Sequence, residues 1–329
     1  MNLDIYVFLL SLLTFLLIDR YKKKIYKSHF LDQPNLERKI HKFSTYLIGG
    51  HFIFILFITS CIFELFFDNN IISLYFAFYC IFAFLIGVID DLKDIRAELK
   101  LFLLLVAYIF LTLLDKNFLL AKVHLSFINK TINFGIYSYF ISALFILLLI
   151  NAINLIDGIN GLAMMIFIIW SSFLYYYLEY NINYFFIFFY IIIFLKIYKG
   201  EFFLGNSGSL LIGSIIGLQS ISLYNDMNQG YPSENIFILF FFPGLDMFRL
   251  FVQRILNKKN PFKGDNLHLH HMLSNKLKLY QVLIIYFLII TISSYFAFND
   301  LFSKIEITLF LIGIYFFLIL FFKKKLVNF

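Results

Sequence analysis

The 329-residue sequence is short of charged residues, of proline and of cysteine, and each shortage excludes a class of protein. Only 14% of the residues are charged, whereas 61% are hydrophobic and the mean hydropathy is +0.86. This balance excludes an ordinary soluble domain, in which about a quarter of the residues are charged. The four prolines leave long helices unbroken, with only Pro243 inside a predicted span, and Cys61 and Cys80 cannot form a disulfide framework. What remains is the composition of an integral membrane protein.

Long apolar stretches make up most of the sequence. A helix needs about 20 mostly apolar residues to cross a bilayer. By this criterion the sequence predicts an all-α polytopic helix bundle, which forms one domain over residues 1–329 and has a loop at 115–135. Eleven spans are predicted, at about residues 3–18, 46–67, 71–89, 99–114, 136–153, 161–178, 184–197, 207–224, 235–252, 280–298 and 305–322.

The positions of lysine and arginine orient these spans. Cytoplasmic loops of membrane proteins carry an excess of both residues. If the N-terminus lies outside and the C-terminus is cytoplasmic, the outer loops hold only Lys116, Lys122, Lys130 and Lys304 of the 27 basic residues. Adding or removing one interior span would reverse every later loop and spoil this asymmetry. The formal net charge of +7 therefore follows from topology and indicates no nucleic-acid partner.

Polar residues interrupt the apolar sequence in a few short stretches, all of which the predicted topology places at the cytoplasmic face. Placing acids and histidines beside hydrocarbon spans is costly, so their recurrence indicates a shared site. For any single acid, a role in capping a helix end explains its position equally well. The stretches are IDDLKDI with Asp90 and Asp91, NAINLIDGING with Asp157, FFLGNSGS with Asn206, and FKGDNLHLHHML with His268, His270 and His271.

These polar stretches contain the parts of a phosphoryl transferase. Adjacent carboxylates near a third acid suit Mg²⁺, which binds one or two carboxylates together with phosphate oxygens, so a diphosphate substrate is implied. The turn from Gly205 to Ser209 can present backbone N–H groups to an anion at the start of a helix. Hydrolase and ATPase functions have no support, because the sequence has no zinc-protease His–Glu pair, no Ser-His-Asp grouping and no Walker loop.

Five motifs together resemble the polyprenyl-phosphate N-acetylhexosamine-1-phosphate transferases of glycosyltransferase family 4. In chain order they are DQPNLERKIH, DDLKD, NAINLIDGINGL, FFLGNSGS and PFKGDNLHLHHML. The HLHH form is similar to the branch that starts O-antigen, capsule and teichoic acid synthesis. The resemblance implies that a UDP-N-acetylamino sugar, such as UDP-N-acetylglucosamine or a related deoxy-amino sugar, gives its sugar-1-phosphate to undecaprenyl phosphate and releases UMP. It also implies a bacterial inner-membrane protein with a cytoplasmic active site.

The resemblance assigns roles to individual residues. It implies that Asp90, Asp91 and Asp157 are catalytic, through metal binding or activation of the lipid phosphate. It implies that Asp91 and Asn206 hold Mg²⁺, for which Mn²⁺ can substitute. A general base is dispensable, because a phosphate monoester with a second pKa of about 6 is mostly dianionic at pH 7. The implied substrate-binding residues are Asn151, Asn154, Asn160, Lys196, Phe203, Arg38, His41, His268, His270 and His271.

Three residues depart from the pattern of the family. Asn206 and Asn160 stand where the family usually has aspartate, and Lys196 stands where it tends to have asparagine near the nucleotide. An amide oxygen can coordinate Mg²⁺ but brings no charge, so the affinity for the metal should fall unless the neighbouring acids compensate. The departures indicate either a sub-branch with an altered sugar preference or a catalytically impaired member that acts as a binding protein.

Two functions from other classes are alternatives to this one. A CDP-alcohol phosphotransferase needs an arginine and further acids after its Asp-Gly pair, but the sequence after Gly158 continues INGLAMMIFIIW. A lipid or solute transporter would place ionisable groups near the bilayer midplane, whereas here they lie at one surface. Asp246 and Arg249 are spaced to pair on one helix face. The sugar, the glycan pathway and the oligomeric state stay open, with a homodimer among the alternatives.

Overall fold

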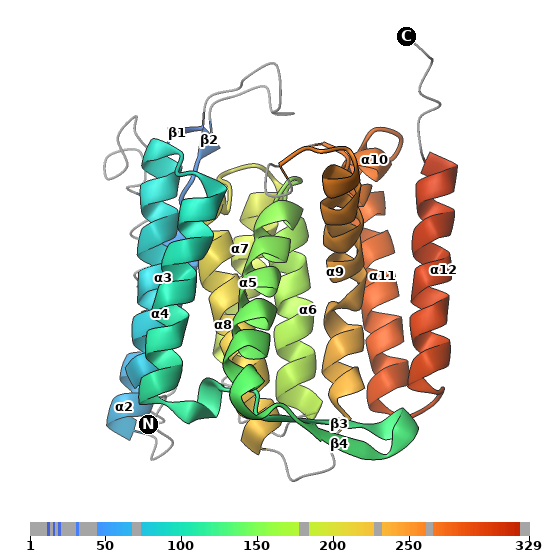
Figure 1. The fold of residues 1–329 in the computed structure, drawn as a ribbon. Helices are drawn as coiled ribbons and strands as arrows, with labels where there is room; N and C mark the ends of the chain where they lie inside the picture. Colours follow the sequence, from blue (N-terminus) through green and yellow to red (C-terminus); the bar gives the residue numbers. More distant parts are fainter. Residues whose placement is uncertain are drawn as a thin grey trace.

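The computed structural model shows a bundle of helices that run alongside one another (Figure 1). It describes residues 12–13, 16, 19–20, 31–32, 45–67, 74–177, 184–226, 232–260 and 266–322. The helices are α2 (Gly49–Phe67), α3 (Leu74–Lys93), α4 (Ala97–Leu114), α5 (Ser138–Ile156), α6 (Leu162–Tyr177), α7 (Tyr184–Tyr198), α8 (Gly205–Asp226), α9 (Ser233–Leu256), α10 (Leu269–Ser274), α11 (Leu279–Phe298) and α12 (Lys304–Phe322).

Seven helices in the described part of the chain are long and apolar enough to cross a membrane, namely α3, α4, α5, α8, α9, α11 and α12. Shorter apolar stretches at residues 49–62, 162–177 and 187–198 form α2, α6 and α7. Each of these helices coincides with one of the predicted spans, so the all-α, polytopic class is confirmed. Most of the predicted span at 3–18 lies outside the described residues. The count of eleven and the orientation of the termini therefore stay predictions.

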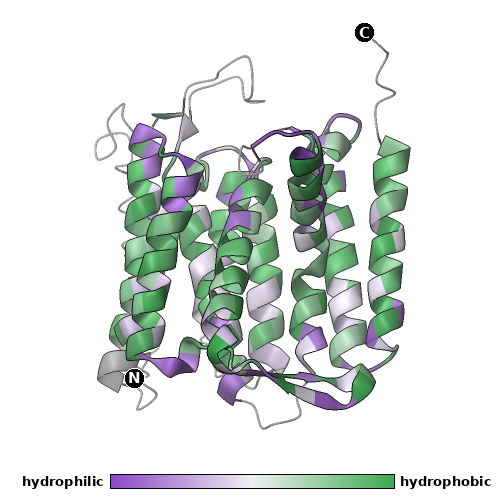
Figure 2. Ribbon diagram, in the orientation of Figure 1, coloured by the Kyte–Doolittle hydropathy of each residue, from purple (hydrophilic) through white to green (hydrophobic). Residues whose placement is uncertain are grey.

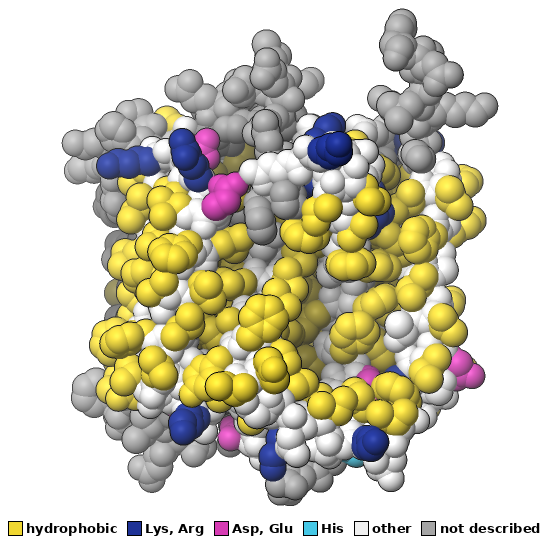
Figure 3. Space-filling model, viewed as in Figure 1, with side chains coloured by type: hydrophobic (Ala, Val, Ile, Leu, Met, Phe, Trp, Pro, Cys, Tyr) yellow, Lys and Arg dark blue, Asp and Glu magenta, His cyan; other side chains and the backbone are white. Residues whose placement is uncertain are grey.

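Apolar side chains cover the flanks of the bundle, and polar ones gather at its two ends (Figure 2). The space-filling view shows the same division, with lysine, arginine and acidic side chains at the ends and an apolar band between them (Figure 3). Among the apolar side chains of α3, α4 and α5, Phe78, Phe110 and Phe140 are 65%, 66% and 67% exposed. Water would penalise an apolar surface of this extent, whereas lipid would not.

Helix α8 lies inside the bundle and is the most deeply buried of the seven candidate spans. Glycines on its neighbours let its first turn approach closely. A Cβ atom on Gly50 of α2 would lie 2.3 Å from the backbone nitrogen of Gly208. One on Gly87 of α3 would lie 2.4 Å from the Cα of Ser207. Such contacts between backbones are possible only without a side chain, so the start of α8 is fixed between α2 and α3.

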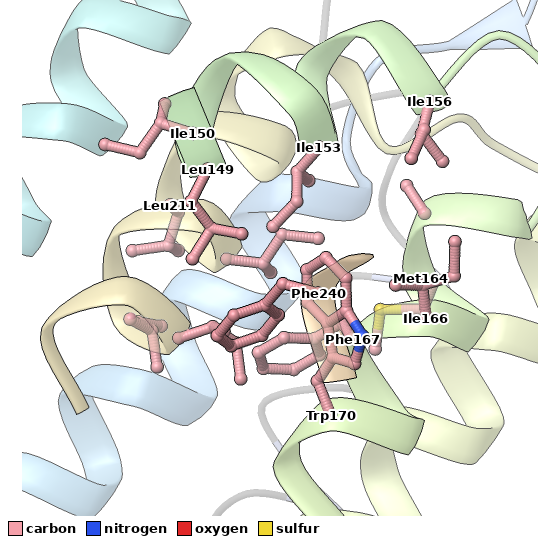
Figure 4. Packing of buried hydrophobic residues seen from close by; sticks show 14 of the residues in the cluster. Leu149, Ile150, Ile153, Ile156, Met164, Ile166, Phe167, Trp170, Leu211 and Phe240 are labelled. Carbon is pink, nitrogen blue, oxygen red and sulfur yellow. The ribbon is translucent and has the colours of Figure 1, made fainter. Parts of the chain in front are cut away.

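The core beside α8 is built from α5, α6 and α9 around Trp170 (Figure 4). The Trp170 ring is fully buried and meets Phe240 edge-on, with ring centroids 4.6 Å apart. Its Nε1–H donates to the carbonyl oxygen of Leu239 at 2.9 Å. Leu239 is four residues before Pro243, which has no N–H to donate to it. Trp170 therefore satisfies the buried carbonyl that the proline leaves free.

Two short antiparallel hairpins add to the helices. Strands β1 (Leu31–Asp32) and β2 (Thr45–Tyr46) pair near the start of α2. Strands β3 (Lys122–Leu125) and β4 (Lys130–Asn133) pair across the end of the bundle opposite α10 (Figure 1). The segment predicted as a loop at 115–135 is thus a hairpin. The 3₁₀ turn η3 (Ser126–Ile128) connects its two strands, and the 3₁₀ turns η2 (Lys116–Phe118) and η4 (Gly135–Tyr137) flank it.

Candidate active site

The polar stretches singled out in the sequence lie at one end of the bundle, called here the site end (Figure 1). Helices α3 and α5 end there, α8 begins there, and α10 lies across it. The structure therefore brings the predicted segments to one end of the bundle, and the assignment of this end to the cytoplasmic face stays a prediction. The opposite end, which carries β3 and β4, is called the hairpin end.

Asp91 binds the first turn of α8. Its Oδ1 accepts the backbone N–H of Asn206 at 2.7 Å, and its Oδ2 accepts that of Ser207 at 3.0 Å. Gly205 permits this approach, because its φ of 76° disfavours other residues and a Cβ there would lie 2.9 Å from Asp91 Oδ2. We expected this turn to present its N–H groups to a substrate anion. The structure shows that two of them bind a carboxylate of the protein itself, which the partial positive charge of the helix start favours.

Asp90 faces a different environment although it is the next residue in the chain. Its side chain is buried, its Oδ1 accepts the N–H of Ile95 at 2.7 Å, and its Oδ2 pairs with Lys100 Nζ at 2.7 Å. These contacts close the turn between α3 and α4. The catalytic role of Asp90 stays a prediction, and both of its oxygens have partners that fit a structural role.

Asp157 directly follows α5 and brings a second carboxyl group close to Asp91. Its loss of hydration inside the bundle raises its pKa well above the usual range, and the negative charge of Asp91 raises it further. Asn154, one turn earlier, accepts a hydrogen bond from Ser209 Oγ at 2.8 Å and so joins α5 to α8. Asn151 points elsewhere, because its Nδ2 contacts Met247 Sδ on α9 at 3.6 Å.

The histidines of the HLHH stretch pack against the residue that follows Asp157. A Cβ atom on Gly158 would lie 2.6 Å from His270 Nε2 and 2.7 Å from His271 Nε2. Burial lowers the pKa of His270 well below its usual range, and His271 and His268 lower it further. His268 and His270 are buried, with 2% and 0% of their surface exposed. Within the described residues, His268 Nε2 and both ring nitrogens of His270 have no hydrogen-bond partner.

Lys196 is engaged by two acids. Its Nζ lies 2.9 Å from Asp19 Oδ2 and 2.9 Å from Glu201 Oε2, so it ties α7 to the N-terminal segment and to the turn before α8. Asn160 lies beside the same turn, with its Nδ2 3.6 Å from where a Cβ of Gly200 would stand. The substrate contacts expected for Lys196 and Asn160 stay predictions.

Phe203 belongs to the strand-like segment that leads into α8. Its N–H donates to the carbonyl oxygen of Tyr46 at 2.8 Å, and its own carbonyl accepts the N–H of Gly49 at 2.8 Å. These bonds place it at the site end, but its contact with substrate stays a prediction. Arg38 and His41 lie outside the described residues.

The donors around the start of α8 fit a divalent cation. Asp91 lies close enough to Asp157 for its negative charge to raise the pKa of that carboxyl group, and a hard cation would relieve such repulsion. Asn206, whose backbone N–H binds Asp91, carries a side-chain amide that could serve as a neutral oxygen donor. The family resemblance implies metal binding by Asp91 and Asn206, and the structure places Asp157 beside Asp91 as a further candidate ligand.

Comparisons with known proteins agree with this arrangement. The sequence matches the family described as Glycosyl transferase family 4 over residues 72–224. It is 31% identical to an undecaprenyl-phosphate alpha-N-acetylglucosaminyl 1-phosphate transferase from Thermotoga maritima, over 79% of this chain and 78% of the relative. It is also 27% identical to a probable undecaprenyl-phosphate N-acetylglucosaminyl 1-phosphate transferase from Bacillus subtilis, over 81% and 76%.

Another relative is named for the transfer of a different group. The chain is 26% identical to a phospho-N-acetylmuramoyl-pentapeptide-transferase from Clostridium perfringens, over 58% of this chain and 65% of the relative. The family resemblance of the five motifs is thereby confirmed across most of the sequence. This multi-pass membrane protein, with Asp91 bound to the start of α8 and its histidines packed beside Asp157, belongs to glycosyl transferase family 4.

Proposed function

We propose that this protein transfers a sugar-1-phosphate from a UDP-N-acetylamino sugar to undecaprenyl phosphate and releases UMP. The observation that carries the proposal is the way the site residues meet: Asp91 binds the start of α8, Asp157 lies close to Asp91, and the HLHH histidines pack against Gly158, the residue after Asp157. These residues come from segments far apart in the sequence. The curated relatives are named for transfer of a sugar phosphate to undecaprenyl phosphate, which supports the same reaction here.

The reaction needs no protein nucleophile. A phosphate oxygen of the lipid attacks the β-phosphorus of the UDP-sugar, and the bond from this phosphorus to the bridging oxygen breaks, so that UMP leaves with that oxygen. Because the lipid phosphate is already mostly dianionic at pH 7, the protein chiefly aligns the two phosphates and offsets their charge. His270 and His271 stand where they can donate hydrogen bonds to phosphate oxygens beside Asp157.

Mg²⁺ bound by Asp91, Asp157 and Asn206 would supply the charge neutralisation that a diphosphate and a lipid phosphate require. Mn²⁺ is expected to replace it, because it prefers similar oxygen donors. In this proposal the ionised carboxylate of Asp157 would bind the cation. Asp157 also precedes Gly158, the residue against which the histidines pack.

The proposed orientation places the site end in the cytoplasm of a bacterium, with eleven spans, the N-terminus outside and the C-terminus inside. The distribution of lysine and arginine supports it, and so does the location of UDP-sugars in the cytoplasm. Synthesis of O-antigen, capsule or another surface glycan is the proposed pathway, with N-acetylglucosamine or a related deoxy-amino sugar as the transferred group.

The test is UMP release by the detergent-purified protein supplied with undecaprenyl phosphate, Mg²⁺ and a panel of UDP-N-acetylamino sugars. Asp91→Asn should abolish release, because the amide removes the charge at the start of α8. Asp300→Asn is the matched control, since Asp300 is an exposed acid beyond the far end of α11 and pairs with Lys304. Failure of every sugar with a folded protein, while an active relative works alongside, would overturn the proposal.

A further inference from the structure

Asp246, on α9, is a buried carboxylate surrounded by hydrogen-bond donors. It is 3% exposed, and its Oδ2 lies 2.8 Å from His268 Nδ1. Its Oδ1 accepts from Tyr315 Oη at 2.7 Å and from Arg249 Nη2 at 3.0 Å. The backbone N–H of Leu269 lies 3.2 Å from both oxygens. The pairing of Asp246 with Arg249 that the sequence indicated is confirmed, but it is one contact of four.

These contacts hold the chain on both sides of His268. Leu269 is bound directly by Asp246, while the guanidinium of Arg249 donates to the carbonyl oxygen of Leu267 at 2.7 Å. Arg249 also donates to Tyr315 Oη at 2.6 Å. Tyr315 belongs to α12, so the last helix of the bundle is joined to the loop that carries the histidines. We call Asp246, Arg249 and Tyr315 the Asp246 clamp.

The clamp determines which nitrogen of His268 is available. A carboxylate only accepts hydrogen bonds, so Nδ1 of His268 carries the hydrogen that binds Asp246, and Nε2 is the nitrogen left for another partner. Nε2 is buried and has no partner among the described residues. The ring of His268 stacks on that of His270 at a centroid distance of 5.4 Å and an angle of 16°. His270 in turn lies against Gly158, next to Asp157.

Asp246, His268 and His270 could instead bind a metal ion. Ligand atoms of Asp246, His268 and His270 lie within 4.8 Å of one another. The carboxylate, however, already accepts from a guanidinium, a hydroxyl, a backbone N–H and an imidazole N–H. A cation would have to displace donors and lie near the positive charge of Arg249. The contacts therefore fit a hydrogen-bonded anchor better than a metal site.

We propose that Asp246 is a positioning residue that acts through His268, fixing the tautomer and orientation of the histidine side of the reaction site. The inference rests on the proposed function, because it assigns His268 to the site of phosphoryl transfer. Asp246 itself does not reach the reacting atoms. Its removal should leave the binding of the UDP-sugar largely intact and slow the chemical step, which is the pattern expected when alignment is lost.

The test is a double-mutant cycle of Asp246→Asn and His268→Gln, measured as UMP release with undecaprenyl phosphate, Mg²⁺ and UDP-N-acetylglucosamine, or the sugar that the wild type prefers. Asp246→Asn should lower kcat by about 10²-fold with little change in KM. In the His268→Gln background, the same change should have almost no further effect. Asp246→Glu, which keeps an accepting carboxylate, should recover part of the loss. Full additivity of the two substitutions, or wild-type kcat in Asp246→Asn, would overturn the inference.

A second readout separates this inference from the proposed function. Hydrogen exchange over Leu269–Ser274 should become faster in Asp246→Asn and stay unchanged in the control Asp300→Asn, whether or not the protein releases UMP. If the wild type releases no UMP with any sugar, the proposed function fails while exchange still tests the clamp. Unchanged exchange in Asp246→Asn would show that Asp246 does not anchor the histidine loop.

Discussion

Acids that accept backbone N–H groups lie at both ends of the helix bundle, but their neighbours differ. At the hairpin end, Glu234 Oε1 accepts the N–H of Ser126 at 2.6 Å and that of Phe127 at 3.4 Å, so its charge holds the hairpin to α9. At the site end, Asp91 also accepts two N–H groups, but Asp157 lies near it as a second negative charge. At the hairpin end the contacts of Glu234 Oε1 come from the protein itself, and its buried Oε2 has no hydrogen-bond partner among the described residues. At the site end the proposed cation would relieve the repulsion between Asp91 and Asp157, so the comparison separates an acid that supports the fold from one available for chemistry.

The largest effect is expected from Asp157→Asn. Removal of one of the two site-end carboxylates should lower UMP release by about 10²–10³-fold, the usual cost of losing one group that stabilises charge in a transition state. Glu234→Gln, at the other end, should leave the activity per folded molecule unchanged. Equal losses in the two variants would abolish the distinction between the ends.

The second-largest effect is expected from Gly158→Ala, which should lower kcat by about 10²-fold. The added methyl group would lie 2.6 Å from His270 Nε2, so the histidines or the Asp157 turn must shift. Gly313→Ala is the matched control, because nothing lies within 4 Å of the Cβ position there. Kinetics of UMP release together with thermal unfolding would separate a local shift from misfolding, and a wild-type rate would show that the turn tolerates the displacement.

Asn206→Asp should increase the difference in negative charge between the two ends, because it adds a third acid beside Asp91 and Asp157. The extra charge should lower the Mg²⁺ concentration for half-maximal activity by about tenfold, since the charge of the ligands tunes the affinity for a divalent cation. A titration of Mg²⁺ into protein stripped with EDTA measures this. Asn225→Asp, at the hairpin end, serves as control, and an unchanged titration in Asn206→Asp would argue against metal binding at this turn.

Glu234→Gln should instead affect stability. Loss of the charge that binds the hairpin should cost about 1–3 kcal/mol of unfolding free energy, the usual range for a disrupted buried hydrogen bond to a charged group. Glu306→Gln is the control, because Glu306 is an exposed acid that binds the N–H of Ser303 at the same end. In detergent, the unfolding temperature should fall more for Glu234→Gln than for Glu306→Gln. Equal decreases would mean that the burial of Glu234 does not contribute to the stability of the protein.

The smallest effect concerns pH. The pKa of Asp157 is higher in the folded protein than in the unfolded chain. At a pH between these two pKa values, Asp157 is therefore protonated in the folded protein and ionised in the unfolded chain. The stability of metal-free protein should therefore be highest below the unfolded pKa and fall as pH rises through this window. Asp157→Asn should flatten the dependence, and Mg²⁺ should offset it by favouring the charged carboxylate. Unfolding in EDTA at several pH values measures this, and a slope unaffected by Asp157→Asn would refute the assignment.

Adjacent residues show how far the sequence alone could go at the site. Asp90 and Asp91 carry the same functional group and were assigned the same role, because a local motif does not tell which way a helix faces. In the structure Asp90 pairs with Lys100, ten residues away, whereas Asp91 binds Asn206, 115 residues away. Likewise Lys196 resembles a substrate contact in sequence, but it pairs with Asp19, 177 residues away.

By itself the sequence determined the membrane class, the position of the described spans, the family and the set of polar segments that meet at one end. These follow from local composition, from helix length against bilayer thickness and from short motifs. Only the tertiary structure decided that Asp91 occupies the start of α8, that Asp246 holds His268, and that Trp170 serves the carbonyl left free by Pro243. Each of these contacts joins residues on different helices, so it depends on how the helices pack.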